Sequence, residues 1–325
     1  MLVAGVDVGS TQTKAILMDD TRIIGRALLD TGARLTEAAG AAFRGAVEAA
    51  GVTEADVACI IGTGYGRYRV QFGHAQVTEI SCHARGAVYL FPGTRSVLDI
   101  GGQDTKAISV NENGQVLDFC MNDKCSAGTG RFLGAASQAL EIPLGDLGTL
   151  ALTSKNPVTM TTTCTVFAES EILGWLARGR KTEDVLMGVH LSIASRSLSL
   201  MRRVGVEPEI TFTGGVARNV AIVRLLAQLT GSPVNVNEES HYCGAIGAAL
   251  YALDRVLVGA EASAEGGAAH EPDDRDRHGI HLHKGRHRRS PGADVRQGHL
   301  PQRLQLREGG RAGARADPRG GRRVA

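Results

Sequence analysis

Two short polar segments carry carboxylate, hydroxyl and amine groups at the same spacing. Residues 7–14 read Asp-Val-Gly-Ser-Thr-Gln-Thr-Lys and residues 99–106 read Asp-Ile-Gly-Gly-Gln-Asp-Thr-Lys, so Asp, Gly, Thr and Lys recur at identical offsets 92 residues apart. Glycine lets backbone N–H groups approach phosphate oxygens, and Ser, Thr and Lys add hydroxyl donors and a positive charge. The chemistry that this pattern predicts is the binding of nucleotide phosphates.

These segments also supply carboxylates at the ends of apolar runs. Asp7, Asp99 and Asp104 are the candidate catalytic residues, because such a carboxylate can hold Mg²⁺ or orient an attacking water molecule. Their spacing alone does not assign these roles. A third glycine-rich turn, within residues 210–219, would complete a nucleotide clamp, and the spacing of a P-loop or of a dinucleotide fingerprint is absent. The predicted ATP-binding residues are Gly9, Ser10, Thr11, Thr13, Lys14, Gly101, Gly102, Gln103, Gly214, Gly215 and Asn219.

The apolar runs around the polar segments indicate the elements that position them. Each segment lies between two such runs, so each reads as strand, tight turn, strand. The repetition predicts a fold built twice, with equivalent hairpins facing one another across a cleft. Strands alternate with helical patterns, so the fold class is α/β. The predicted helices cover residues 35–51, 128–140, 168–177, 182–204, 220–229 and 244–256.

Length and composition allow two lobes. The chain has 325 residues, 43% of them hydrophobic, and we predict a first lobe over residues 1–92 and a second over residues 93–257. No stretch approaches the roughly 18 apolar residues that span a bilayer, and the start lacks a basic segment followed by an apolar one. We therefore expect a cytoplasmic protein without a membrane partner.

The last 68 residues differ in composition from the rest. Residues 258–325 hold 13 arginines and one lysine against nine acidic residues, a net charge of +5, and contain no Phe, Tyr or Trp. Such a segment buries too little to offset its ordering entropy, so we predict a disordered tail. Its excess of Arg over Lys also resembles out-of-frame translation of GC-rich DNA. Irregular Arg-Gly spacing and the lack of stacking groups argue against a nucleic-acid partner.

Two of the six cysteines stand next to predicted helix starts. Cys125 precedes a glycine-rich segment, and Cys164 follows a run of threonines. A helix N-terminus favours the thiolate, which is the form that ligates iron. Two thiolates make half of a four-thiolate site, and a twofold dimer would complete it. From spacing alone a zinc site or plain buried thiols remain alternatives, while the lack of an export signal argues against a disulfide framework.

Several motifs together resemble the family of ATP-dependent activators of 2-hydroxyacyl-CoA dehydratases and ATPase subunits of benzoyl-CoA reductase. The resemblance runs from about residue 2 to residue 256 and implies a duplicated, two-lobed ATPase fold of the actin, hexokinase and Hsp70 type, which is ribonuclease H-like. The motifs are the turn from Asp7, Gly-Thr-Gly-Tyr-Gly-Arg at 62–67, residues 99–104, Asn-Asp-Lys-Cys at 122–125, Cys-Thr-Val-Phe-Ala-Glu-Ser-Glu at 164–171 and Thr-Gly-Gly-Val at 213–216.

The resemblance also implies cofactors and partners. It implies one ATP cleft per chain and one [4Fe-4S] cluster held by Cys125 and Cys164 of each subunit, in a homodimer or with a related second ATPase subunit. A ferredoxin-like donor would load the cluster, and ATP hydrolysis would drive the electron to the catalytic subunits of a CoA-thioester reductase or dehydratase. Likeness around residues 81–87 and 118–120 leans to the benzoyl-CoA side. The remaining cysteines, which match no ligand position, are Cys59, Cys82, Cys120 and Cys243.

Two other functions fit the same clefts. A metal-free small-molecule kinase of the same superfamily would need no iron. A non-catalytic regulatory member would show no ATPase activity, and no helix-turn-helix extension fits the chain.

Overall fold

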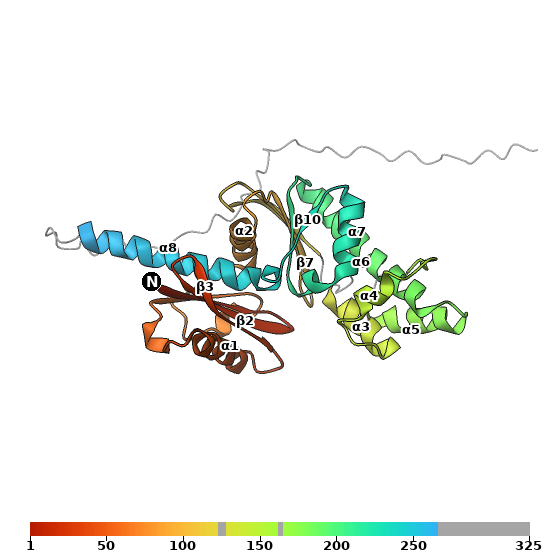
Figure 1. Ribbon diagram of the computed structural model, residues 1–325, viewed down its shortest axis with the longest axis horizontal. Coiled ribbons are helices and arrows are strands. Elements are labelled where there is room, and N and C mark those ends of the chain that lie inside the picture. The colour runs from red at the N-terminus through yellow and green to blue at the C-terminus, as the bar shows by residue number, and fades with distance from the viewer. Residues whose placement is uncertain (123–127, 162–164, 266–325) are drawn as a thin grey trace, which may run out of the picture. The chain divides into compact units, whose positions relative to one another are not determined.

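The computed structural model describes residues 1–122, 128–161 and 165–265 (Figure 1). Its first sheet contains the hairpin predicted at residues 2–18. The strand order is β3-β2-β1-β4-β5, with β1 antiparallel to β2 and parallel to β4. Side chains alternate along β1, so Val3 faces one core while Ala4 and Val6 face another. The strands are β1 (Leu2–Val8), β2 (Gln12–Asp19), β3 (Arg22–Asp30), β4 (Cys59–Thr63) and β5 (Ala75–Gln76).

The second sheet repeats the topology of the first. Its order is β10-β9-β6-β7-β8, in which β6 is antiparallel to β7 and parallel to β9. Asp7 stands opposite Lys14 in the first sheet, and Asp99 stands opposite Lys106 in the second. The predicted duplication is therefore confirmed at the level of residue register. The strands are β6 (Ser96–Ile100), β7 (Thr105–Val110), β8 (Val116–Met121), β9 (Ile210–Thr213) and β10 (Val234–Asn235).

Helices cover both sheets. In Figure 1, α1 lies on one face of the first sheet and α8 runs along the other. The helices α3 to α7 pack around the largest apolar core, which includes Phe132, Leu186 and Phe212. The α-helices are α1 (Leu35–Ala50), α2 (Glu79–Leu90), α3 (Gly130–Leu140), α4 (Leu147–Ala151), α5 (Thr165–Ala177), α6 (Thr182–Val204), α7 (Val220–Thr230) and α8 (Cys243–Glu265). Short 3-10 helices are η1 (Glu54–Asp56), η2 (Arg67–Arg69), η3 (Gly215–Arg218) and η4 (Ser240–Tyr242).

Glycines allow α8 to approach both its neighbours closely. A Cβ on Gly5 of β1 would lie 2.0 Å from the carbonyl oxygen of Ala245, and a Cβ on Gly247 would lie 1.9 Å from that of Cys82 on α2. The helix therefore completes the core of the first sheet, although it follows the second sheet in the chain. The lobe boundaries stay a prediction, and the contacts of α8 depart from a contiguous division at residues 92 and 93.

The length and apolarity of α8 correct two expectations. Ser240–Gly259 is long and apolar enough, by length and composition, to cross a membrane, so the expectation that no stretch approaches this limit is wrong. More than half of this segment is buried inside the fold, where Ile246 and Ala249 pack against the first sheet. Residues 258–265 continue the helix into the predicted tail because Ala and Glu are strong helix formers. The rest of that tail, residues 266–325, lies outside the described residues.

Candidate nucleotide-binding site

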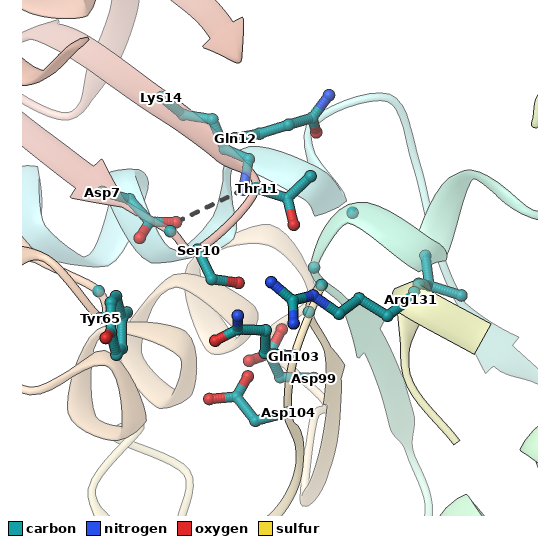
Figure 2. Close-up of a pocket in the computed structure, with 18 of the residues that line it drawn as sticks. Asp7, Ser10, Thr11, Gln12, Lys14, Tyr65, Asp99, Gln103, Asp104 and Arg131 are labelled. Carbon is teal, nitrogen blue, oxygen red and sulfur yellow. Dashed lines mark ion pairs between the residues drawn. The ribbon is translucent and has the colours of Figure 1, made fainter. Parts of the chain in front are cut away.

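A cavity of about 880 Å³ lies where the two predicted hairpin turns face each other (Figure 2). The turns touch at its floor, since a Cβ on Gly102 would lie 2.0 Å from Oγ1 of Thr11. The structure thus brings together the two turns, whose equivalent residues are 92 positions apart, as the repetition predicted. The predicted site residues that line the cavity are Asp7, Gly9, Ser10, Thr11, Lys14, Asp99, Gly101, Gly102, Gln103, Asp104, Gly214, Gly215 and Asn219.

Thr13 is the predicted binding residue that does not line the cavity. Side chains alternate along β2, so Gln12 and Lys14 face the cavity while Thr13 points the other way and is fully buried. Its hydroxyl lies 2.9 Å from Oγ1 of Thr31, which donates a hydrogen bond to the carbonyl oxygen of Gly9. Thr13 therefore supports the first turn from behind, and we no longer assign it to ATP.

The aspartates at the ends of β1 and β6 are buried, at 5% and 4% exposure, and each faces a lysine. Nζ of Lys14 lies 3.6 Å from Oδ2 of Asp7, and Nζ of Lys106 lies 3.5 Å from Oδ2 of Asp99 and 2.9 Å from Oδ1 of Asp104. Burial by itself raises the pKa of Asp99, but the neighbouring cationic groups outweigh it and hold that pKa below its usual value. The Asp99 carboxyl group therefore remains ionised near neutral pH.

A glycine with a left-handed backbone flanks each aspartate. Gly64 follows β4 with φ of 87°, and a Cβ there would lie 2.3 Å from Oδ1 of Asp7. Gly214 follows β9 with φ of 86°, and a Cβ there would lie 2.4 Å from Oδ1 of Asp99. Only glycine combines this backbone with so close an approach. The third glycine turn is therefore the second-lobe equivalent of the turn after β4, a relation that we did not predict.

Helix α2, absent from the predicted elements, supplies two further lining residues. Glu79 and His83 both face the cavity. Nδ1 of His83 lies 2.9 Å from Oγ1 of Thr213 and 3.7 Å from Oδ1 of Asp99, so the ring bridges α2 and the second sheet. The sequence did not predict this helix, because polar residues that face a cavity interrupt the apolar period by which a helix is recognised. The segment Ser-Cys-His-Ala-Arg within it was noted only for its likeness to the family.

Asn219 is held by the elements that surround it. Its Oδ1 accepts hydrogen bonds from the backbone N–H groups of Ala221 and Ile222, each at 3.1 Å, and so caps α7. Its Nδ2 lies 3.0 Å from Nε2 of His190, whose Nδ1 lies 2.7 Å from the carbonyl oxygen of Leu186. Burial lowers the pKa of His190, in keeping with a neutral ring that accepts from the amide.

The second turn is hydrogen-bonded to both flanks of residues 123–127. Thr105 donates from its backbone N–H to Asn122 and from its hydroxyl to the carbonyl oxygen of Gly128, at 2.8 and 2.9 Å. At the start of α3, the N–H group of Gly130 donates to Gly101, at 2.9 Å. The second turn is therefore hydrogen-bonded to described residues on both sides of residues 123–127.

The predicted cluster ligands, Cys125 and Cys164, lie outside the described residues. Among the described cysteines, burial raises the pKa of the Cys59, Cys82 and Cys243 thiols. The described ranges contain no group of three or more His, Cys, Asp and Glu side chains placed to hold a metal ion. The oxygen donors of the cavity still suit Mg²⁺, which binds one or two carboxylates and completes its coordination with water and phosphate.

Comparison with known proteins gives consistent matches over the same part of the chain. The profile of the BadF/BadG/BcrA/BcrD ATPase family matches residues 4–252. The 2-hydroxyisocaproyl-CoA dehydratase activator of Clostridioides difficile is 39% identical over 78% of this chain and 96% of its own. The (R)-2-hydroxyglutaryl-CoA dehydratase activating ATPase of Acidaminococcus fermentans is 41% identical over 77% and 96%. A benzoyl-CoA reductase subunit of Thauera aromatica is 31% identical over 78% and 94%.

Solved structures confirm the predicted fold. The structure of the C. difficile activator with bound ADPNP superposes with a TM-score of 0.77 at 38% identity, over 80% of this chain and 97% of that one. A ROK family glucokinase from Streptomyces griseus superposes with a TM-score of 0.52 at 15% identity, over 78% of this chain and 100% of that one. The second likeness concerns the two-lobed kinase fold alone.

Proposed function

Since the chain belongs to the BadF/BadG/BcrA/BcrD ATPase family, we propose that it is an ATP-hydrolysing activator that passes a low-potential electron from an iron–sulfur cluster to a CoA-thioester enzyme. The observation that carries the proposal is the pair of aspartate-bearing turns that meet in one cavity, in a chain 39% and 41% identical to two dehydratase activators.

The residues of the glycine turns and the three aspartates each have a role in this proposal. The backbone N–H groups of the glycine turns and the hydroxyls of Ser10 and Thr11 contact the phosphates. Asp7 and Asp99 hold Mg²⁺, directly or through water, and Asp104 orients the attacking water. When bound, Mg²⁺ neutralises charge on the phosphates. Water adds to the terminal phosphorus and the bond to the bridging oxygen breaks, which gives ADP and phosphate.

Cys125 and Cys164 of two subunits are proposed to hold one [4Fe-4S] cluster. Four thiolates are the usual ligand set of such a cluster, which supplies one-electron chemistry when bound. The hydrogen bonds of Thr105 and Gly101 to the flanks of residues 123–127 support a link between the nucleotide cavity and Cys125. Raising an electron by about 0.3 V costs roughly 7 kcal/mol, a demand that hydrolysis can meet and a passive carrier cannot.

The proposed partners are a ferredoxin-like donor, a second copy of this chain and a catalytic enzyme in the cytoplasm. The identities of 39% and 41% to the dehydratase activators, against 31% to the benzoyl-CoA reductase protein, favour a 2-hydroxyacyl-CoA dehydratase. This reverses the lean that the sequence alone suggested.

The test is to purify the protein without oxygen and to measure iron, ATP hydrolysis and reduction of a 2-hydroxyacyl-CoA dehydratase. About four iron atoms per two chains are expected from half a site per chain. Cys164→Ala should lose the iron, whereas the control Cys120→Ala should keep it. Iron-free protein that transfers phosphate to a small molecule would overturn the proposal in favour of a kinase, and full iron in Cys164→Ala would overturn the ligand assignment.

A further inference from the structure

The lysines that line the cavity are already neutralised by carboxylates. Lys14 faces Asp7, and Lys106 faces both Asp99 and Asp104, at 2.9 to 3.6 Å. Both lysines are buried. In the absence of a metal ion, a buried lysine that turned to a phosphate would leave an aspartate uncompensated, which is costly at low dielectric. In this structure Lys14 and Lys106 are therefore paired with carboxylates, and a cavity cation without such a pairing is better placed to bind a phosphate directly.

Two cavity-lining arginines have no such partner among the residues that the structure describes. Neither Arg131 nor Arg218 forms an ion pair with any carboxylate in the described part of the chain, and both are exposed. The two arginines lie on different elements. Arg131 is in the first turn of α3, whereas Arg218 ends η3, two residues after the apolar lining residue Val216.

Arg131 reaches the point where the two turns meet. Its backbone N–H donates to the carbonyl oxygen of Gly102 at 2.9 Å. In the amide orientation that satisfies both groups, the side-chain oxygen of Gln103 accepts from both terminal guanidinium nitrogens, at 3.2 and 2.5 Å. Figure 2 shows the guanidinium pointing between Ser10 and Gln103, into the space that both turns border.

We propose that Arg131 binds the terminal phosphate of the nucleotide and gives the site its preference for a triphosphate over a diphosphate. This inference rests on the proposed function, because it requires ATP as the ligand. Arginine presents five donors in a planar fork, so one side chain can keep its hydrogen bond to Gln103 and still donate to a phosphate oxygen.

The position of Arg218 suggests a different contact. Leu144 and Val216 provide apolar lining that suits a nucleobase, and Arg218 lies in the same short helix as Val216. We therefore expect Arg218 to lie nearer the nucleoside part, where it would affect ATP and ADP alike. This makes Arg218→Ala the matched control for Arg131→Ala, because each removes one exposed cavity arginine.

The experiment measures the Kd values of ADPNP and of ADP, each with Mg²⁺, by calorimetry on the purified full chain. Arg131→Ala should raise the Kd of ADPNP by about 10- to 100-fold, the usual loss for one charge-assisted hydrogen bond, and that of ADP by no more than about threefold. Arg131→Gln, which keeps the length of the side chain and an amide donor, should show the same selective loss if charge is the cause. Arg218→Ala should shift both Kd values by a similar factor.

An equal shift for ADPNP and ADP in both Arg131 variants, or no shift in either, would overturn the inference. Retained ADP binding shows that a variant is folded. The proposed function fails separately: wild-type protein that binds neither nucleotide, or that binds both but holds no iron, contradicts that proposal. Wild-type protein that binds ADPNP and ADP, beside an Arg131→Ala variant that matches it, contradicts the assignment of Arg131 alone.

Discussion

Replacement of Gly247 by alanine should separate the two helices α2 and α8. The added Cβ would lie 1.9, 2.6 and 2.8 Å from the carbonyl oxygen, carbonyl carbon and Cα of Cys82. These are backbone atoms of α2, so no side-chain rotation relieves the contact. Normal contact distances require α2 and α8 to move apart by about 1 Å or more. The apolar contacts of the small residues at this crossing, such as Ala245 and Ala248, would then loosen.

The expected net destabilisation follows from two opposing contributions. Overpacking of a filled core costs about 1–3 kcal/mol and occasionally more, and a clash with backbone belongs at the upper end, near 4 kcal/mol. Alanine in place of glycine in a helix returns about 1 kcal/mol. The net loss is about 3 kcal/mol, which lowers the Tm of a protein of this size by about 6–12 °C.

The assay is calorimetric unfolding of Gly247→Ala beside Gly174→Ala, both prepared without oxygen. Gly174 is within α5, and a Cβ there would meet no described atom within 4 Å. This control should therefore gain about 0.5–1 kcal/mol. Because α2 also carries Glu79 and His83 into the cavity, Gly247→Ala should weaken ADPNP binding as well. A Tm for Gly247→Ala at or above that of the wild type would refute the packing argument.

Three further predictions concern coupling, pH and the C-terminal segment. Asp99→Asn should reduce ATP hydrolysis by about 100-fold and reduce electron delivery in parallel. Both rates are measured in one preparation, and normal electron delivery after hydrolysis has stopped would refute the coupling. Burial lowers the pKa of His190, and burial with neighbouring cations lowers that of His241 to about 4, so the folded state binds fewer protons than the unfolded state between pH 7 and 5. The urea midpoint should therefore fall as pH is lowered through this range, and a constant or rising midpoint would contradict the burial argument. Truncation after Val256 should leave ATPase activity intact, because the buried contacts of α8 end at Leu253; loss of activity in the truncated protein would show that the segment contributes to the site.

The hairpins could be predicted because their signal is local. Apolar runs flank polar turns, and the two copies confirm one another, so the two hairpins, the fold class and the cavity residues of both turns follow from residues 2–18 and 96–110. Thr13 was misassigned because the turn motif was taken as a whole, whereas the alternation of side chains along β2 separates Thr13 from Gln12 and Lys14.

The placement of α2 and α8 could not be predicted from local pattern. The alanine-rich residues of α8 indicate a buried helix, but they do not specify which sheet covers it, and its partner Gly5 is more than 230 residues away in the chain. For α2, cavity-facing Glu79 and His83 interrupt the apolar period. The roles of Arg131 and Lys14 likewise depend on contacts that exist only in three dimensions.

The late position of α8 in the chain has a consequence for synthesis on the ribosome. The face of the first sheet that carries Val3 and Ile61 is covered by α8, a helix that ends about 200 residues after β4. At about 5–20 residues per second, that interval lasts roughly 10–40 s. During this time the apolar side chains of Val3, Ile16 and Ile61 lack their cover, so the nascent first sheet is a candidate client for chaperones. A chain that is interrupted before Cys243 lacks α8, so this apolar face of the first sheet stays uncovered.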